Sequence, residues 1–299
     1  MSSQLLPTLK KKNLHERDNY ILFDEPTHKY TITCDPNSQY TSVTTWNHTH
    51  FSHFDADQVI KNMMKGKNWN SENKYWNMTA EQIKEQWKNN GITESGAGTN
   101  LHFDIECFMN QDIVYEDNEI PNKITHQELL EVYEDEITNG IPPPNHSDEW
   151  SFFLNYIKQF PDFEPYRTEW TVFHEELKLA GSIDMVYKND DGTLNIYDWK
   201  RAKEIKKNTS FRKFATTECI EHLPDTNFWH YSLQLNTYKA ILEAKYGQKI
   251  KDLYLVRLHP NNSKKTYELY KCADLSEEIA GLFEFRKKEL EKNNINVKP

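Results

Sequence analysis

Residues 181–203 read GSIDMVYKNDDGTLNIYDWKRAK. Two stretches in which apolar and polar residues alternate flank the turn sequence NDDG, and this pattern predicts a β-hairpin. Asp184 interrupts the first apolar stretch, and Asp198 and Lys200 stand two residues apart at the end of the second. Side chains alternate along a strand, so Asp198 and Lys200 share one face. The hairpin therefore carries charged side chains where a purely structural hairpin needs none.

These three charges suit a divalent metal ion. Asp184 shares its strand face with Ser182 and Val186, so its side chain points either to solvent or into a cleft. Two carboxylates held close together repel each other unless a cation lies between them, and oxygen ligands favour Mg²⁺ or Mn²⁺. With a lysine beside it, such an ion suits phosphodiester hydrolysis. The alternative is a hairpin with surface acids and a strand-end lysine, and the spacing taken alone favours that alternative.

The pattern outside the hairpin predicts an α/β core. We expect a helix at 147–160 with Ser147 as its cap, and then strands and helices at 166–176, 179–189, 193–201, 227–247, 250–260 and 275–293. Upstream, we expect two short strands within 20–33, a helical entry capped by Ser42 or Thr44, a helix at 79–89 that ends near Gly91, and another helix from about Gly98. The order helix, three-stranded meander, helix, strand predicts a compact core with N-terminal and helical additions.

Composition narrows the class of protein. The chain has 299 residues and a net charge of −10, which argues against a protein that coats nucleic acid non-specifically. No secretory signal or membrane span is evident. The cysteines Cys34, Cys107, Cys219 and Cys272 lie far apart and form no C-x-x-C pair. We therefore expect unpaired thiols in an intracellular, reducing compartment such as the cytoplasm, the nucleus or a viral factory.

Five motifs in order resemble those of the PD-(D/E)XK nucleases, specifically the RecB-like branch. They are GTNLHFDIE with Gly98, His102 and Glu106, a strand glutamate at Glu169, the aspartate Asp184, the tripeptide DWK with Asp198 and Lys200, and QLNTY with Gln234 and Tyr238. Within that branch the SVT segment, DWK and the spacing to the last motif are most similar to the mitochondrial genome-maintenance exonucleases. The resemblance covers about residues 40–60 and 95–260.

The resemblance implies a restriction-endonuclease-like core and a role for each matching residue. Asp184 and Asp198 would bind Mg²⁺ or Mn²⁺ together with the backbone carbonyl of Trp199, and Lys200 would be the catalytic lysine. His102 would add an imidazole ligand, or else pack within its helix. Glu106 would support the site or be a structural surface residue, and Glu169 would be a supporting catalytic acid.

The resemblance implies that the helix after the hairpin contributes to substrate binding. Gln234 and Tyr238 lie one turn apart, so they share a face. They would contact DNA phosphate or brace the lysine, with core packing as a rival role for Tyr238. The four cysteines that hold an iron–sulfur cluster in several RecB-like relatives are not matched here, so we expect no such cluster.

An acidic protein must concentrate positive charge locally in order to bind DNA. Residues 200–213, KRAKEIKKNTSFRK, hold seven basic residues against one acid, and Arg201, Lys203, Lys206 and Lys207 are the candidate phosphate contacts. In residues 61–76 lysines alternate with aromatic residues, a pattern that is typical either of single-strand binding or of core packing.

The sequence thus predicts a Mg²⁺- or Mn²⁺-dependent deoxyribonuclease of DNA repair, replication or recombination. We expect it to act as an exonuclease on single-stranded or frayed DNA ends. The alternatives are a structure-specific endonuclease and a non-catalytic nucleic-acid-binding module that kept the fold. We expect an N-terminal accessory region at 1–95 and a nuclease core at 96–299 with a helical insertion at 111–160.

Overall fold

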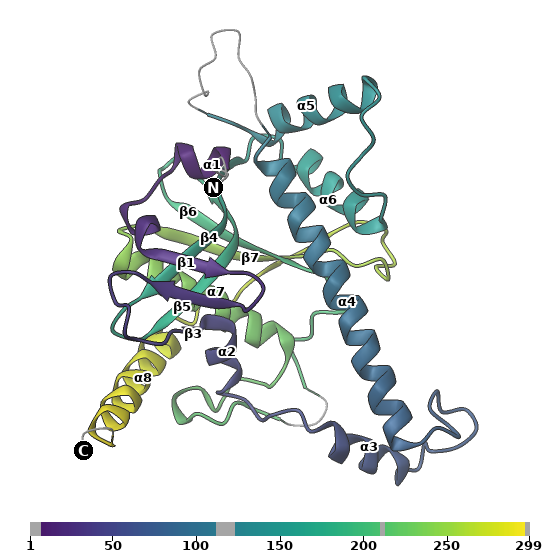
Figure 1. The fold of residues 1–299 in the computed structure, drawn as a ribbon. Coiled ribbons are helices and arrows are strands. Elements are labelled where there is room, and N and C mark those ends of the chain that lie inside the picture. The colour runs from purple at the N-terminus through teal and green to yellow at the C-terminus, as the bar shows by residue number, and fades with distance from the viewer. Residues whose placement is uncertain (1–6, 112–122, 210–212, 297–299) are drawn as a thin grey trace.

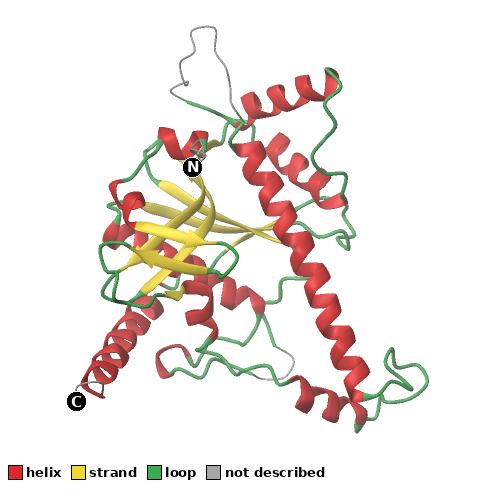
Figure 2. Ribbon diagram, in the orientation of Figure 1, coloured by secondary structure: helices red, strands yellow, loops and turns green. Residues whose placement is uncertain are grey.

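A computed structural model describes residues 7–111, 123–209 and 213–296, and Figures 1 and 2 show its arrangement. The helices are α1 (Thr8–Lys12), α2 (Val43–His48), α3 (Ala56–Met64), α4 (Ala80–Met109), α5 (His126–Thr138), α6 (Asp148–Gln159), α7 (Asn227–Lys245) and α8 (Ser276–Asn296), with 3₁₀ turns η1 (Glu16–Tyr20) and η2 (Glu218–Ile220). The strands are β1 (Ile21–Asp24), β2 (Lys29–Ile32), β3 (Thr41–Ser42), β4 (Glu164–His174), β5 (Leu179–Lys188), β6 (Leu194–Lys200), β7 (Ile250–Arg257) and β8 (Glu268–Lys271).

The predicted meander forms the centre of the main sheet. β4, β5 and β6 are antiparallel neighbours, and β7 pairs with β6 in parallel after the crossover helix α7. β8 continues the sheet beyond β7, and β3 pairs in parallel with the first residues of β5. The prediction of an α/β core in the order helix, meander, helix, strand is confirmed.

Helices cover both faces of this sheet. On one face α2, α7 and α8 pack through residues such as Trp46, Leu233 and Ile279. On the other face the C-terminal half of α4 packs with α5 and α6, through residues such as Ile105 and Phe153. The central strands are apolar on both sides because they are buried on both sides. None of the described helices combines the length and apolar character that a membrane span requires.

Helix α4 differs from the prediction of two helices. It runs without a break through Gly91 and Gly98, although each interior glycine costs about 1 kcal/mol relative to alanine. The helix begins at a capping box, in which Thr79 and Gln82 exchange side-chain-to-backbone hydrogen bonds. Burial of Ile83 near one end and of Leu101 near the other holds the exposed middle in place. Tertiary packing of the two ends therefore outweighs the weak helix propensity of the middle.

The predicted division at residue 95 is also wrong, because it falls inside α4. The N-terminal part belongs to the same core: β3 joins the main sheet, and the β1–β2 hairpin packs on Phe173 and Ala180. The predicted insertion at 111–160 does contain α5 and α6, while its residues 112–122 lie outside the described part of the chain. In Figure 1 the β1–β2 hairpin lies in front of the sheet, on the side toward α4.

Candidate active site

The site lies where β5 and β6 separate. Their ladder ends at the pair Met185 and Tyr197, and the next position in the same register sets Asp184 opposite Asp198. The register between β4 and β5 likewise sets Glu169 opposite Asp184. Residues directly opposite on antiparallel strands point to the same face, so three carboxylates form a row across three strands. Like charges in such a row are destabilising, which favours a bound cation.

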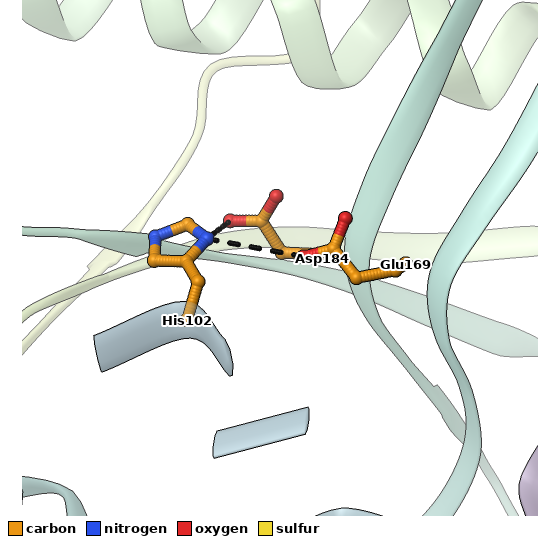
Figure 3. A group of neighbouring side chains, drawn as sticks. All are labelled: His102, Glu169 and Asp184. Atoms are coloured by element: carbon orange, nitrogen blue, oxygen red, sulfur yellow. Dashed lines mark ion pairs between the residues drawn. The ribbon is translucent and has the colours of Figure 1, made fainter. Parts of the chain in front are cut away.

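His102 reaches this row from α4, as Figure 3 shows. Its Nδ1 lies 3.6 Å from Asp184 Oδ2 and 3.9 Å from Glu169 Oε1. Its Nε2 lies 2.9 Å from the carbonyl oxygen of Trp199 and donates a hydrogen bond to it. That hydrogen bond leaves the lone pair of Nδ1 directed at the carboxylates when the ring is neutral.

Charge within the site is strongly coupled. Burial lowers the pKa of His102, but the carboxylates of Asp184 and Glu169 outweigh burial and raise this pKa to about 9. Burial raises the pKa of Asp184, against the opposing effects of His102 and Lys200. Burial likewise raises the pKa of Asp198 to about 6, although Lys200 opposes the rise. The site therefore holds several ionisable groups with shifted pKa values in one place, as active sites commonly do.

Lys200 is fixed by two contacts. Its Nζ lies 2.6 Å from Asp198 Oδ2 and 4.8 Å from the ring centroid of Tyr231. Burial lowers the pKa of Lys200, but Asp198 and Asp184 outweigh burial and raise it above the usual lysine value. The lysine is therefore cationic and held in place. Tyr231 was not singled out in the sequence, although it lies three residues before Gln234 on the same helix.

Glu169 occupies a strained backbone position. Its φ is 41°, within the left-handed region that non-glycine residues seldom adopt. Its side chain accepts a 2.8 Å hydrogen bond from Ser182 Oγ, another residue that was not singled out in the sequence. The C-terminal end of α4 is tied to the same strand, because Asn110 Nδ2 donates to Thr168 Oγ1 at 2.8 Å. These contacts fix the separation between Glu169 and the helix that carries His102.

The two residues of the QLNTY motif do not reach the surface equally. Tyr238 is buried at 3% exposure, which favours the packing role over contact with DNA phosphate. A Cβ at position 181 would lie 2.7 Å from the Tyr238 ring, so Gly181 is the residue that fits beneath it on β5. Gln234 is half-buried and lies one helical turn before Tyr238 on α7.

The basic segment after the hairpin divides into two parts. Arg201 was expected to contact DNA, but its guanidinium pairs with Glu94 of α4 and with Glu149 of α6, the latter at 2.6 Å. It therefore links two helices to the end of β6. Lys203 and Lys206 are largely exposed, and each also pairs with an acid: Lys203 Nζ lies 3.7 Å from Glu94 Oε1 and Lys206 Nζ lies 2.6 Å from Glu204 Oε1. Lys207 Nζ lies 4.5 Å from the Phe228 ring centroid.

A cleft opens beside the carboxylate row. Its volume is about 590 Å³, and its lining includes His102, Glu106, Glu169 and Ser182. Glu106 thus faces the cleft, one turn of α4 beyond His102. Burial raises the pKa of Glu106 to about 6, with Glu169 and Glu25 adding to the rise.

The donor set fits a divalent metal ion. Ligand atoms of His102, Glu169 and Asp184 all lie within 4.8 Å of one another. Asp198, expected as a ligand, is not in this group and pairs with Lys200. The Trp199 carbonyl, also expected as a ligand, accepts a hydrogen bond from His102. Asp198 Oδ2 is buried and, apart from that ion pair, has no hydrogen-bond partner among the described residues. One imidazole and two carboxylates are ligands that suit Mn²⁺ as well as Mg²⁺.

Comparison with known families agrees with this geometry. The family model of the PD-(D/E)XK nuclease superfamily matches residues 75–298. The chain belongs to this superfamily. Its mixed α/β core is consistent with the restriction-endonuclease-like fold, and superfamily membership makes the chain a nuclease that uses divalent metal ions. No curated protein matches the chain.

Proposed function

We propose that the chain is a Mg²⁺- or Mn²⁺-dependent deoxyribonuclease of the RecB-like branch. The observation that carries the proposal is the row Glu169–Asp184–Asp198 across three strands, with His102 on one side and Lys200 on the other. The imidazole of His102, which comes from a helix that precedes the meander, supports the assignment to the RecB-like branch. Retention of all these charges in one buried place argues against a non-catalytic binding module, because clustered charges destabilise a fold that does not use them.

Each residue has a distinct proposed role. His102, Glu169 and Asp184 hold the ion, and Trp199 orients the imidazole through its carbonyl oxygen. A divalent ion at this position supplies charge neutralisation at the phosphate and lowers the pKa of an attacking water. Lys200 places a fixed positive charge where negative charge develops on the phosphate. Asp198 keeps that ammonium group in position through its ion pair.

We propose an exonuclease that acts on single-stranded or frayed ends, on the basis of the resemblance to RecB-like exonucleases. DNA would approach over the exposed lysines of the segment after β6, chiefly Lys203 and Lys206. A structure-specific endonuclease is the alternative.

A topology assay separates these activities. Linear and circular single-stranded DNA of one sequence are incubated with the protein and Mn²⁺ or Mg²⁺, with EDTA as the control. We expect metal-dependent loss of the linear strand and persistence of the circle. Cleavage of the circle at the same rate would contradict the exonuclease proposal and favour the endonuclease, and no cleavage of either would contradict the nuclease proposal.

A further inference from the structure

The cleft beside the carboxylate row lies between two segments that are far apart in the sequence. Phe23, Glu25 and His28 of the β1–β2 hairpin line one side, and residues of α4 line the other. Glu169, Thr171 and Ser182 of β4 and β5 complete the lining. Since His102 and Glu169 also belong to the metal-ligand group, the cleft is continuous with the place where a scissile phosphate would bind.

The lining of the cleft is acidic. Glu25, Glu106 and Glu169 contribute carboxylates, and none of the described lining residues is Lys or Arg. The raised pKa of Glu106, caused first by burial and then by Glu169 and Glu25, indicates that these carboxylates lie close enough to interact. Since Glu169 and His102 are assigned to the metal ion, Glu25 and Glu106 are the carboxylates left to repel a phosphodiester backbone that continued through the cleft. The cleft is therefore unsuited to a continuing strand.

The same lining suits a nucleobase. Phe23 and Phe103 are 39% and 64% exposed, and Phe23 stacks on Tyr30. The exposed parts of the two rings offer surfaces on which a base can stack. Three of the α4 residues that line the cleft are small, namely Ser95, Gly98 and Thr99, which leaves open space beside the larger ones. A volume of about 590 Å³ lies within the range of pockets that hold small molecules of nucleoside size.

We propose that this cleft receives the terminal nucleoside of the substrate strand, and that its carboxylates select a strand end that carries a hydroxyl group in place of a phosphate. The inference rests on the proposed nuclease function and extends it to the identity of the end. It also gives a physical reason for action at ends, because the backbone cannot extend past the cleft.

The first experiment tests the end group. Single-stranded oligonucleotides with an internal label are prepared with a hydroxyl or a phosphate at each terminus, and kcat/KM is measured with Mn²⁺. At the terminus where degradation starts, we expect a terminal phosphate to lower kcat/KM by roughly tenfold. Glu25→Gln should reduce the ratio of kcat/KM between hydroxyl and phosphate ends. Glu291→Gln, on the exposed part of α8, should leave that ratio unchanged. Equal rates for the two ends, or a ratio unchanged by Glu25→Gln, would overturn the selection by charge.

The second experiment fills the cleft. A Cβ at Gly98 meets no atom within 4 Å, and Gly98 lines the cleft, so the side chain of Gly98→Leu would enter it. Gly91→Leu is the matched control: it lies on the same exposed part of α4, also has open space at Cβ, and gains the same helix propensity.

We expect Gly98→Leu to raise KM at least several-fold, with Mn²⁺ affinity and the thermal midpoint of unfolding matching those of Gly91→Leu. Identical kinetics for the two variants would overturn the cleft as the site of the terminal nucleoside while leaving the nuclease proposal intact. If the wild-type protein cleaved no DNA, both the nuclease proposal and the cleft proposal would be overturned.

Discussion

Lys200 has a buried anion on one side and an aromatic ring on the other, and these neighbours predict how its removal would act. Lys200→Ala removes the fixed positive charge proposed for phosphate stabilisation and leaves Asp198, which is 2% exposed, without its ion-pair partner. We expect the single-turnover cleavage rate to fall by about 10²-fold or more. Single-strand affinity should change little, because the exposed lysines after β6 are the proposed phosphate contacts.

The control is Lys249→Ala, an exposed lysine outside the site, which should cleave at the wild-type rate. A near-normal rate for Lys200→Ala would remove Lys200 from the mechanism.

Tyr231 is a positioning residue for that lysine. Its ring centroid lies 4.8 Å from Lys200 Nζ, a distance at which a cation and an aromatic ring attract each other. Tyr231→Leu should lower the cleavage rate by roughly 3- to 30-fold, the range that corresponds to a cation–π contribution. Tyr231→Phe keeps the ring and should restore most of the rate. If Phe and Leu lowered the rate equally, the hydroxyl group and not the ring would be the important feature.

At the scale of elements, the N-terminal turn η1 is fixed to β4 by a buried ion pair. Asp18 Oδ2 lies 2.7 Å from Arg167 Nη1, both side chains are 2% exposed, and Trp170 Nε1 donates to the other carboxylate oxygen. Asp18→Asn leaves Arg167 buried and unpaired, so we expect the free energy of unfolding to fall by about 3–5 kcal/mol. Urea unfolding measures the decrease.

The control is Asp35→Asn, which breaks the partly exposed pair with Lys178 and should cost about 1 kcal/mol or less. Equal decreases in the free energy of unfolding for Asp18→Asn and Asp35→Asn would contradict the role of burial.

Burial raises the pKa of Asp18, but Arg167 outweighs burial and holds this pKa below its ordinary value. The wild-type protein should therefore lose this stabilisation as the pH falls through the lowered pKa, and Asp18→Asn should not show that acid dependence.

The elements that could be predicted are those with a strong local signal. The hairpin of β5 and β6 was predicted because strand alternation surrounds the NDDG turn. Ser147 was predicted as a cap and is the cap of α6, and of the two candidates Ser42 and Thr44 it is Ser42 that caps α2. β8 was missed because it has only four residues and contains two charges. The middle of α4 was missed because its glycines indicate a break, and only packing at its ends keeps it helical.

The same distinction applies to the site. Asp184, Asp198 and Lys200 lie on one hairpin, so strand periodicity was enough to bring them together. Tyr231 and Ser182 act through interactions between elements, which no local pattern encodes. The cleft depends on the approach of the β1–β2 hairpin to α4, two segments that the sequence assigned to separate regions.

At the scale of the whole molecule, a net charge of −10 means that the proposed binding of DNA depends on positive charge gathered locally. Neutralising Lys203, Lys206 and Lys207 together should lower single-strand affinity. It should also flatten the slope of log K against log salt by roughly 0.7 for each DNA phosphate that the variant no longer neutralises. Fluorescence anisotropy across a salt series measures the slope.

Arg201→Gln provides the comparison, because Arg201 is engaged with Glu94 and Glu149. That variant should lower stability and keep the wild-type slope. A flattened slope for Arg201→Gln, or an unchanged slope for the triple lysine variant, would place the DNA elsewhere.

The central claim is that His102, Glu169 and Asp184 together hold the catalytic metal ion. Calorimetric titration of Mn²⁺ into the wild-type protein and into His102→Ala tests it most directly, with His53→Ala, an exposed histidine outside the site, as the control. We expect His102→Ala to raise the Mn²⁺ dissociation constant by about tenfold or more, to raise the Mn²⁺ concentration for half-maximal cleavage in parallel, and to leave DNA affinity nearly unchanged. His53→Ala should match the wild-type protein. Equal Mn²⁺ dissociation constants for wild type and His102→Ala would contradict the account.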